Sequence, residues 1–204
     1  MLAVQKHVPE KWACMYIKRW LETPFQKADG KVRQKSWKGT PQGGVISPLL
    51  ANLFLHYTFD KWLEVTDQNV KYVRYADDAI IHCRSQRHAE WLLNKLNKRM
   101  NDCNLELHPD KTQLVYCRDY RRKGKFPKVK FDFLGYSFKS ATKKSKKNGR
   151  LFLGYDCEIS ISSKKKIANK IAELIDERKT CNSIVGLAQK LNQSIRGWVN
   201  YYGH

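Results

Sequence analysis

The sequence has no run of eighteen apolar residues, so it offers no ordinary membrane-spanning helix. Its first residues lack the charged stretch followed by an apolar core that marks a secretory signal, which argues against secretion. The six cysteines are scattered without a close pair, which argues against a zinc knuckle or a disulfide scaffold. This pattern fits reduced thiols in a cytoplasmic protein.

Acidic residues are scarce relative to basic ones. The 204 residues include 39 Lys and Arg but 19 Asp and Glu, for a formal net charge of +20. This excess indicates a polyanionic partner, with nucleic acid as the first candidate and an acidic membrane surface as the alternative. No basic amphipathic helix dominates the chain, so we expect no membrane partner. With 42% hydrophobic residues, the chain can build one ample domain, alone or with a small appendage.

Two neighbouring acids, Asp77 and Asp78, lie in the tetrapeptide 75–78 (Tyr-Ala-Asp-Asp). The flanking segments 70–74 and 79–83 are typical of strands, which predicts the acids at the tip of a β-hairpin. Phosphoryl transfer along a nucleic acid uses two hard cations held by carboxylates on a rigid element. We predict Asp77 as the direct metal ligand and Asp78, on the opposite side of the pleat, as a weaker ligand or a charge that tunes the site. The alternative is an Asp-Asp turn that merely ends a strand.

The first part of the chain alternates helical and loop signals. Helical spacing of apolar residues predicts a helix over 9–23, and Asp29-Gly30 predicts a tight hairpin within 25–38. A glycine-rich loop over 39–48 ends in Ser47, predicted as an N-cap, and Pro48, predicted as the first helical residue. A buried helix is expected to follow, up to about residue 63.

Beyond the predicted hairpin, an amphipathic helix is expected over 86–103, capped by Ser85 and covering a sheet, with charged residues such as Arg99 facing away from the core. Segments 105–107 and 112–117 are predicted as strands around a turn, and 131–138 as a strand pair bent at Gly135. This order predicts an α+β fold, an antiparallel sheet with helices on one face.

The C-terminal third differs in composition. Residues 118–150 contain thirteen Lys or Arg and two Asp, a balance of +11, which indicates either a nucleic-acid surface or a solvated linker. Two helices are predicted after it, capped by Ser163 and Ser183. We therefore expect a first domain over 1–160 and a small helical module over 161–204.

Five motifs, in order, resemble the reverse transcriptase of group II intron-encoded maturases, and retron-type reverse transcriptases more broadly. They are 39–52 (Gly-Thr-Pro-Gln-Gly-Gly-Val-Ile-Ser-Pro-Leu-Leu-Ala-Asn), the tetrapeptide 75–78, 107–112 (Leu-His-Pro-Asp-Lys-Thr), 133–136 (Phe-Leu-Gly-Tyr) and 195–202 (Ile-Arg-Gly-Trp-Val-Asn-Tyr-Tyr). The resemblance implies a polymerase palm followed by the thumb or the start of a maturase-specific region. It also implies a bacterial protein whose activity is RNA-directed DNA polymerisation.

The resemblance also implies roles for individual residues. Asp77 and Asp78 match the catalytic, metal-binding hairpin, with two Mg²⁺ ions expected and Mn²⁺ as a substitute. Gln42 and Gly43 match positions that touch the nascent base pair, and Tyr75 could pack on the primer end. The loop could instead be a turn before a buried helix, and Tyr75 an ordinary strand aromatic.

Further roles concern the leaving group and the primer. Lys111 could protonate or steady the leaving pyrophosphate, although an exposed lysine at a strand end is equally common. Phe133, Leu134, Gly135 and Tyr136 are predicted to grip the primer backbone, with a core strand pair as the alternative.

Nucleic-acid contacts are predicted from the basic residues of this region. The cations expected to neutralise phosphates of the template–primer duplex or of intron RNA are Lys143, Lys144, Lys146, Lys147, Arg150, Lys164, Lys165 and Lys166. Trp198, Tyr201 and Tyr202 could stack on bases, but their helical spacing favours a core role.

The expected partners are an RNA template, a DNA or RNA primer, deoxynucleoside triphosphates and the intron RNA. One departure from the family concerns a further metal-binding aspartate, which the family carries on a strand that would precede Met1. We therefore expect a truncated palm-and-thumb chain without fingers, inactive by itself. The alternative function is a non-catalytic RNA-binding module that aids intron splicing.

Overall fold

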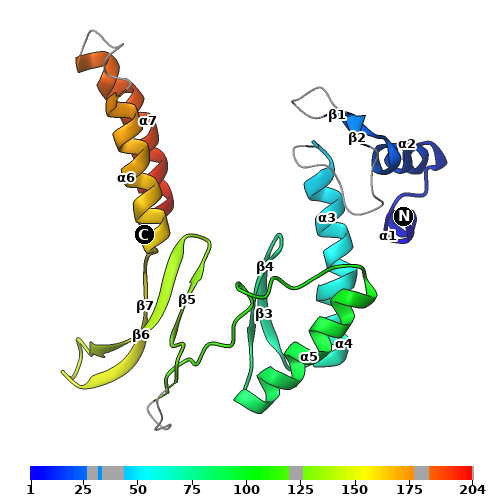
Figure 1. Cartoon of the computed structure of the whole chain (residues 1–204). Helices are drawn as coiled ribbons and strands as arrows, with labels where there is room; N and C mark the ends of the chain where they lie inside the picture. The colour runs from blue at the N-terminus through cyan, green and yellow to red at the C-terminus, as the bar shows by residue number, and fades with distance from the viewer. Residues whose placement is uncertain (27–31, 34–43, 120–125, 177–183, 204) are drawn as a thin grey trace. The chain divides into compact units, whose positions relative to one another are not determined.

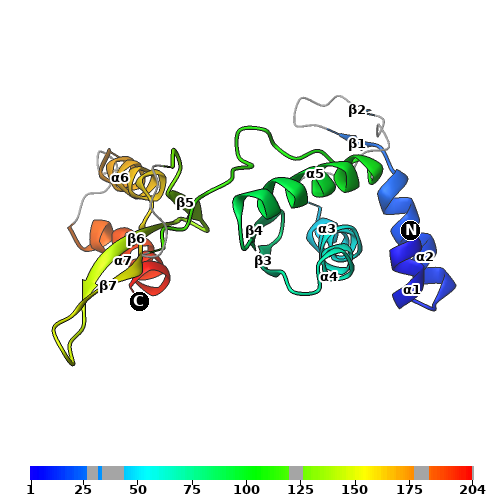
Figure 2. The ribbon, with the colours of Figure 1, turned by 90° about the horizontal axis from the view of Figure 1, so that it is seen from below.

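A computed structural model describes residues 1–26, 32–33, 44–119, 126–176 and 184–203. The chain divides into two compact units, Met1–Leu114 and Val115–His204, and each is described by itself (Figures 1 and 2). Both units mix helices with antiparallel strands, which confirms the predicted α+β class.

The first unit opens on two short helical elements, α1 (Leu2–His7) and α2 (Lys11–Glu22). Helix α2 confirms the helix predicted over 9–23. It ends where the Thr23 amide and hydroxyl both donate to the Arg19 carbonyl, one residue before Pro24. Strands β1 (Phe25–Gln26) and β2 (Val32–Arg33) pair antiparallel and confirm the hairpin, whose Asp29-Gly30 turn lies outside the described residues.

A long helical rod follows, formed by α3 (Ser47–Leu55), a π-helical turn η1 (His56–Asp60) and α4 (Lys61–Thr66), as Figure 1 shows. The helix begins one residue earlier than predicted. Ser47 is thus its first residue, Ile46 takes the cap position, and no side chain caps it. The expectation of a buried helix holds only for its second half, because Leu49 is 66% exposed while Leu63 is fully buried.

The tetrapeptide 75–78 joins β3 (Lys71–Tyr75) to β4 (Asp78–His82), and the two strands pair antiparallel. Helix α5 (Gln86–Asp102) confirms the predicted amphipathic helix, and Ser85 caps it by accepting a hydrogen bond from the His88 amide at 3.2 Å. The core joins the rod to one face of α5 and consists of Phe59, Leu63, Leu92, Leu96 and Met100. This core holds the base of the hairpin.

Three predictions for the first unit are wrong. Arg99 was expected to face away from the core, but its guanidinium donates to the carbonyls of Tyr57 and Thr58. Segments 105–107 and 112–117 form no strands, although the turn at 109–111 is present. Leu105 and Leu107 instead pack on the core, so burial of alternate side chains, and not strand pairing, explains their apolar pattern.

The second unit contains a three-stranded sheet, in the order β5 (Lys130–Phe133), β6 (Tyr136–Lys144) and β7 (Leu151–Ile159). Strands β5 and β6 confirm the predicted pair with its turn at Gly135. Strand β7 has no counterpart in the sequence-based expectation. It pairs with β6 along nine residues, from Tyr136 opposite Ile159 to Lys144 opposite Leu151.

Two helices complete this unit, α6 (Ile161–Asp176) and α7 (Ile184–Tyr202). Ser163 does not cap α6 as predicted. It lies buried in the first turn, where its amide donates to the Ser160 hydroxyl at 3.1 Å. Ser183 lies outside the described residues. Because the sheet and both helices belong to one compact unit, the domain boundary near residue 160 stays a prediction.

Within the described parts of the chain, the helices fall short of the length and apolarity needed to cross a bilayer.

Candidate active site

The hairpin turns through two residues, Ala76 and Asp77, and the pair Tyr75 and Asp78 closes it. Its predicted position at residues 75–78 is confirmed. Ala76 adopts a φ of 52°, a left-handed conformation that costs a non-glycine residue about 1–2 kcal/mol. Two-residue hairpin turns usually place Asn or Gly there, so the turn is held against a local preference.

Side chains alternate between the two faces of the hairpin. Tyr72 and Arg74 face the helical rod, where the Tyr72 ring meets Phe59 edge-on with centroids 5.7 Å apart. Val73 and Tyr75 are 53% and 64% exposed on the other face. Asp78 lies opposite Tyr75 and is exposed, as is Asp77 in the turn. Both carboxylates are thus open to solvent at the tip of an element anchored at its base.

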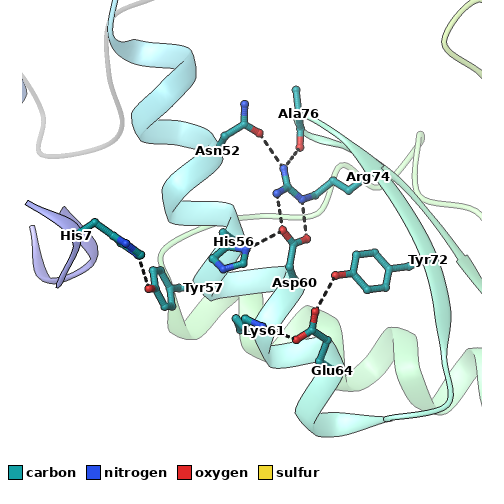
Figure 3. Close-up of polar contacts among 10 residues, drawn as sticks. All are labelled: His7, Asn52, His56, Tyr57, Asp60, Lys61, Glu64, Tyr72, Arg74 and Ala76. Carbon is teal, nitrogen blue, oxygen red and sulfur yellow. Dashed lines mark hydrogen bonds and ion pairs between the residues drawn. The ribbon is translucent and has the colours of Figure 1, made fainter.

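A polar network beneath the tip involves a residue that the sequence did not single out, Arg74 (Figure 3). Its Nε donates to Asp60 Oδ1 at 2.8 Å and its Nη2 to Asp60 Oδ2 at 2.6 Å. Its Nη1 donates to Asn52 Oδ1 at 2.9 Å and to the Ala76 carbonyl at 2.8 Å. The guanidinium therefore links the helical rod directly to the turn.

The ion pair is largely shielded from water, with side chains 13% exposed for Arg74 and 12% for Asp60. Burial raises the pKa of Asp60, but the hydrogen bonds and charge of Arg74, with a smaller contribution from His56, more than offset it and leave that pKa lowered. The hydrogen bonds to Asp60 raise the pKa of Arg74. Both groups are therefore charged across the physiological range.

The lowered pKa predicts how stability depends on pH. Asp60 binds protons less readily in the folded protein than in the unfolded one, so its ionised form stabilises the fold. This stabilisation is fully present above the ordinary pKa of 3.8 and is lost as the pH falls through the lower pKa of the folded protein. Asp60→Asn should lower the free energy of unfolding at pH 7 by about 2 kcal/mol. Urea unfolding between pH 7 and pH 2.5 should show a smaller acid-dependent loss in the variant, and equal losses in both proteins would contradict this assignment.

The donor set at the tip suits a hard cation. Asp77 and Asp78 offer carboxylate oxygens, and Mg²⁺ is commonly held by one or two carboxylates together with substrate phosphates. Over the described ranges, no group of three or more His, Cys, Asp and Glu side chains gathers into a metal site. The tip therefore fits a metal that shares its coordination with a phosphate-bearing substrate.

The remaining predicted residues of the first unit are less informative. Lys111 is exposed in the turn at 109–111. Gln42 and Gly43 lie outside the described residues.

In the second unit, the predicted primer grip forms a tight turn held on two sides. Leu134 and Gly135 have φ values of 50° and 80°. Tyr201 donates its hydroxyl to the Leu134 carbonyl at 2.8 Å, and the Ser160 amide donates to the Gly135 carbonyl at 2.9 Å. Tyr136 in turn donates to the Tyr201 carbonyl. A side chain at Gly135 would place its Cβ 2.8 Å from the Tyr202 hydroxyl, so only glycine fits.

A pocket lies beside this turn, between it and the two helices. Its lining residues are Leu134, Gly135, Ser163, Lys166, Ile167, Lys170, Trp198, Tyr201 and Tyr202. Trp198 and Tyr202 are half-buried and Tyr201 is 50% exposed, and all three line the pocket. Phe133 is half-buried in β5.

The predicted phosphate-binding cations fall into two groups. Lys144, Lys146, Lys147 and Arg150 are exposed around the end of the β6–β7 hairpin. Lys143 is also exposed but pairs with Asp156 at 2.8 Å across the strands. On α6, the side chains of Lys164, Lys165 and Lys166 are exposed, and Lys166 reaches the pocket.

Comparison with known proteins gives two family matches and a curated relative. The reverse transcriptase (RNA-dependent DNA polymerase) model matches residues 4–138, and the group II intron maturase-specific domain matches residues 164–204. The "Group II intron-encoded protein LtrA" of Lactococcus lactis subsp. cremoris is 26% identical over 253 residues, covering 83% of this chain. The same protein from strain MG1363 matches equally well. The chain spans about 40% of the length of these relatives.

The first match includes the hairpin with Asp77 and Asp78, and the second begins within α6 and includes α7. These two matches agree with the ordered motifs read from the sequence. The chain therefore belongs to the reverse transcriptase (RNA-dependent DNA polymerase) family, and its C-terminal part matches the maturase-specific domain of group II introns.

Proposed function

We propose that this chain forms part of an enzyme that copies an RNA template by joining deoxynucleotides to a primer 3′-hydroxyl. The observation that carries the proposal is the exposure of Asp77 and Asp78 at the tip of a hairpin whose base is anchored in a core. A rigid, open carboxylate pair is what two-metal nucleotidyl transfer requires. The family match over residues 4–138 supports this assignment.

In this proposal, Asp77 is a direct ligand of the metal and Asp78 a second, weaker one. Two Mg²⁺ ions, replaceable by Mn²⁺, would activate the attacking 3′-hydroxyl and stabilise the departing pyrophosphate. Tyr75 lies on the same hairpin face as Asp78, where its exposed ring can pack on the primer end. Lys111 supplies a proton or a positive charge to the leaving group, and Gln42 with Gly43 contacts the nascent base pair.

The second unit holds the primer and the template in this proposal. The turn formed by Leu134 and Gly135, with Phe133 and Tyr136 on either side of it, contacts the primer backbone. The exposed cations of the β6–β7 hairpin and of α6 contact phosphates. The partners are an RNA template, a DNA or RNA primer, deoxynucleoside triphosphates and the intron RNA. A cytoplasmic location in a bacterium belongs to the same proposal.

The match to the maturase-specific domain favours a second candidate function, RNA binding that assists intron splicing without catalysis. The exposed cations support it as strongly as they support polymerisation. The two candidates differ in whether the carboxylate pair is used.

Primer extension separates these two functions. The protein, expressed from its natural reading frame, is incubated with a primed RNA template, deoxynucleoside triphosphates and Mg²⁺. The polymerase function predicts a labelled DNA product that disappears on chelation of the metal. Tight RNA binding without any product, in Mg²⁺ or Mn²⁺, would reject it in favour of the splicing function.

A further inference from the structure

The backbone at the hairpin tip is in a conformation that it does not favour by itself. Ala76 has a φ of 52°, and strained conformations of this kind persist only where surrounding contacts hold them. The carbonyl of Ala76 belongs to the peptide bond that leads into Asp77. Because the peptide bond is planar, a contact that holds this carbonyl also fixes the position of the Asp77 Cα, from which the side chain extends.

Arg74 supplies the side-chain contact to this carbonyl. Its Nη1 lies 2.8 Å from the Ala76 oxygen and 2.9 Å from Asn52 Oδ1, so one nitrogen joins the turn to helix α3. Its other donors make two parallel hydrogen bonds to Asp60. Figure 3 shows these contacts converging on one guanidinium. A planar group with several directed donors can do this, whereas a lysine ammonium, at the end of a flexible stem, cannot reproduce it.

Asp60 gives the guanidinium a firm anchor. It is the last residue of the π-helical turn η1 and is 9% exposed, and Phe59 and Leu63 beside it belong to the core. Helix irregularities of this type commonly accompany functional positions. His56, one turn earlier, lies 3.4 Å from Asp60 Oδ2 and adds a further contact.

We propose that Arg74 is a positioning residue that orients Asp77 through the Ala76 carbonyl, with Asp60 and Asn52 as its supports. The inference rests on the proposed function, because orienting Asp77 matters only if Asp77 binds the metal. Arg74 itself does not touch substrate or metal in this account. Its role is to hold the turn in its strained form before the metal arrives, so that binding does not have to order it.

The test compares Arg74→Lys with the unaltered protein by NMR of ¹⁵N-labelled chain without metal. Lysine keeps the charge opposite Asp60 but not the contacts to the Ala76 carbonyl and Asn52. We expect amide signals of residues 76–79 to shift or broaden, while those of α5 stay in place. Lys61→Gln is the matched control, since it breaks the exposed ion pair between Lys61 and Glu64 one residue from Asp60. Hairpin signals that change no more in Arg74→Lys than in Lys61→Gln would overturn the proposal.

If Arg74→Lys does not fold, Asp60→Asn takes its place and is judged by the same signals. It leaves the guanidinium intact but removes the charged acceptor that orients it, so the signals of residues 76–79 should again change. Unchanged signals in a folded Asp60→Asn protein would overturn the proposal.

A Mn²⁺ titration then links the positioning role to the metal. Paramagnetic broadening of the Asp77 and Asp78 signals should require roughly tenfold more Mn²⁺ in Arg74→Lys than in the unaltered protein. An equal Mn²⁺ requirement in the two proteins would overturn the positioning role. If Mn²⁺ does not broaden these signals in the unaltered protein, the metal assignment of the proposed function fails. The comparison without metal still decides whether Arg74 holds the turn.

Discussion

In the protein expressed from its natural reading frame, Asp77→Asn is expected to reduce RNA-templated primer extension by roughly three orders of magnitude. The side chain is exposed at the hairpin tip and fills a two-residue turn, so its replacement by an amide of equal size should leave the fold intact. Asparagine removes the negative charge that attracts a divalent cation. RNA affinity and its salt dependence should stay unchanged, because Asp77 is not expected to contact phosphate.

Asp102→Asn provides the matched control, because Asp102 is also exposed and is the last residue of helix α5. It should extend primers at the unaltered rate. Undiminished extension by Asp77→Asn would reject this residue as the metal ligand. If RNA binding is lost together with primer extension, Asp77 is needed for the stability of the fold and not as a metal ligand.

Replacing Lys144, Lys146, Lys147 and Arg150 together with glutamine should weaken binding of single-stranded RNA on the order of 100-fold at 0.15 M salt. These four cations are exposed around the β6–β7 hairpin end, where phosphates can reach them. Each lost contact to single-stranded RNA removes about 0.7 from the slope of log affinity against log salt concentration. The slope should therefore become shallower by about 3, with little change in sequence preference.

Lys139→Gln tests whether RNA affinity depends on cations that have no acidic partner or simply on total charge. Lys139 lies on the same strand β6, but it pairs with Glu158 at 2.7 Å and is less available to a phosphate. Its replacement should change the slope by much less than any one of the four. An unaltered slope in the fourfold variant would exclude the hairpin end as the RNA surface.

The parts of the fold that the sequence predicts well are those specified by local pattern. The 3.6-residue period of α5 places Leu92, Leu96 and Met100 in the core, and Ser85 caps it as its position suggests. The hairpin that carries Asp77 and Asp78 is equally local, since alternating residues flank a two-residue turn. Interactions between residues close in the sequence are enough to specify this helix and this hairpin.

The parts that the sequence misses depend on contacts between distant residues. The sequence does not indicate strand β7, because its acids Asp156 and Glu158 pair with lysines on β6, and only the register of the strands reveals this pairing. In the sequence, Arg74 has the appearance of an ordinary strand residue, and only the fold places it against Asp60, fourteen positions earlier. An acid between the apolar residues Phe59 and Leu63 was the available signal, since a buried carboxylate needs a partner.

The proposed polymerase function requires that the hairpin tip bind a divalent cation through Asp77. The most direct measurement is the position of Mn²⁺ in crystals of the protein grown with excess Mn²⁺ and a deoxynucleoside triphosphate, located by its anomalous scattering. We expect a peak about 2.1 Å from a carboxylate oxygen of Asp77, with Asp78 beside it. Mn²⁺ bound elsewhere on the protein, with no peak at this carboxylate, would contradict it.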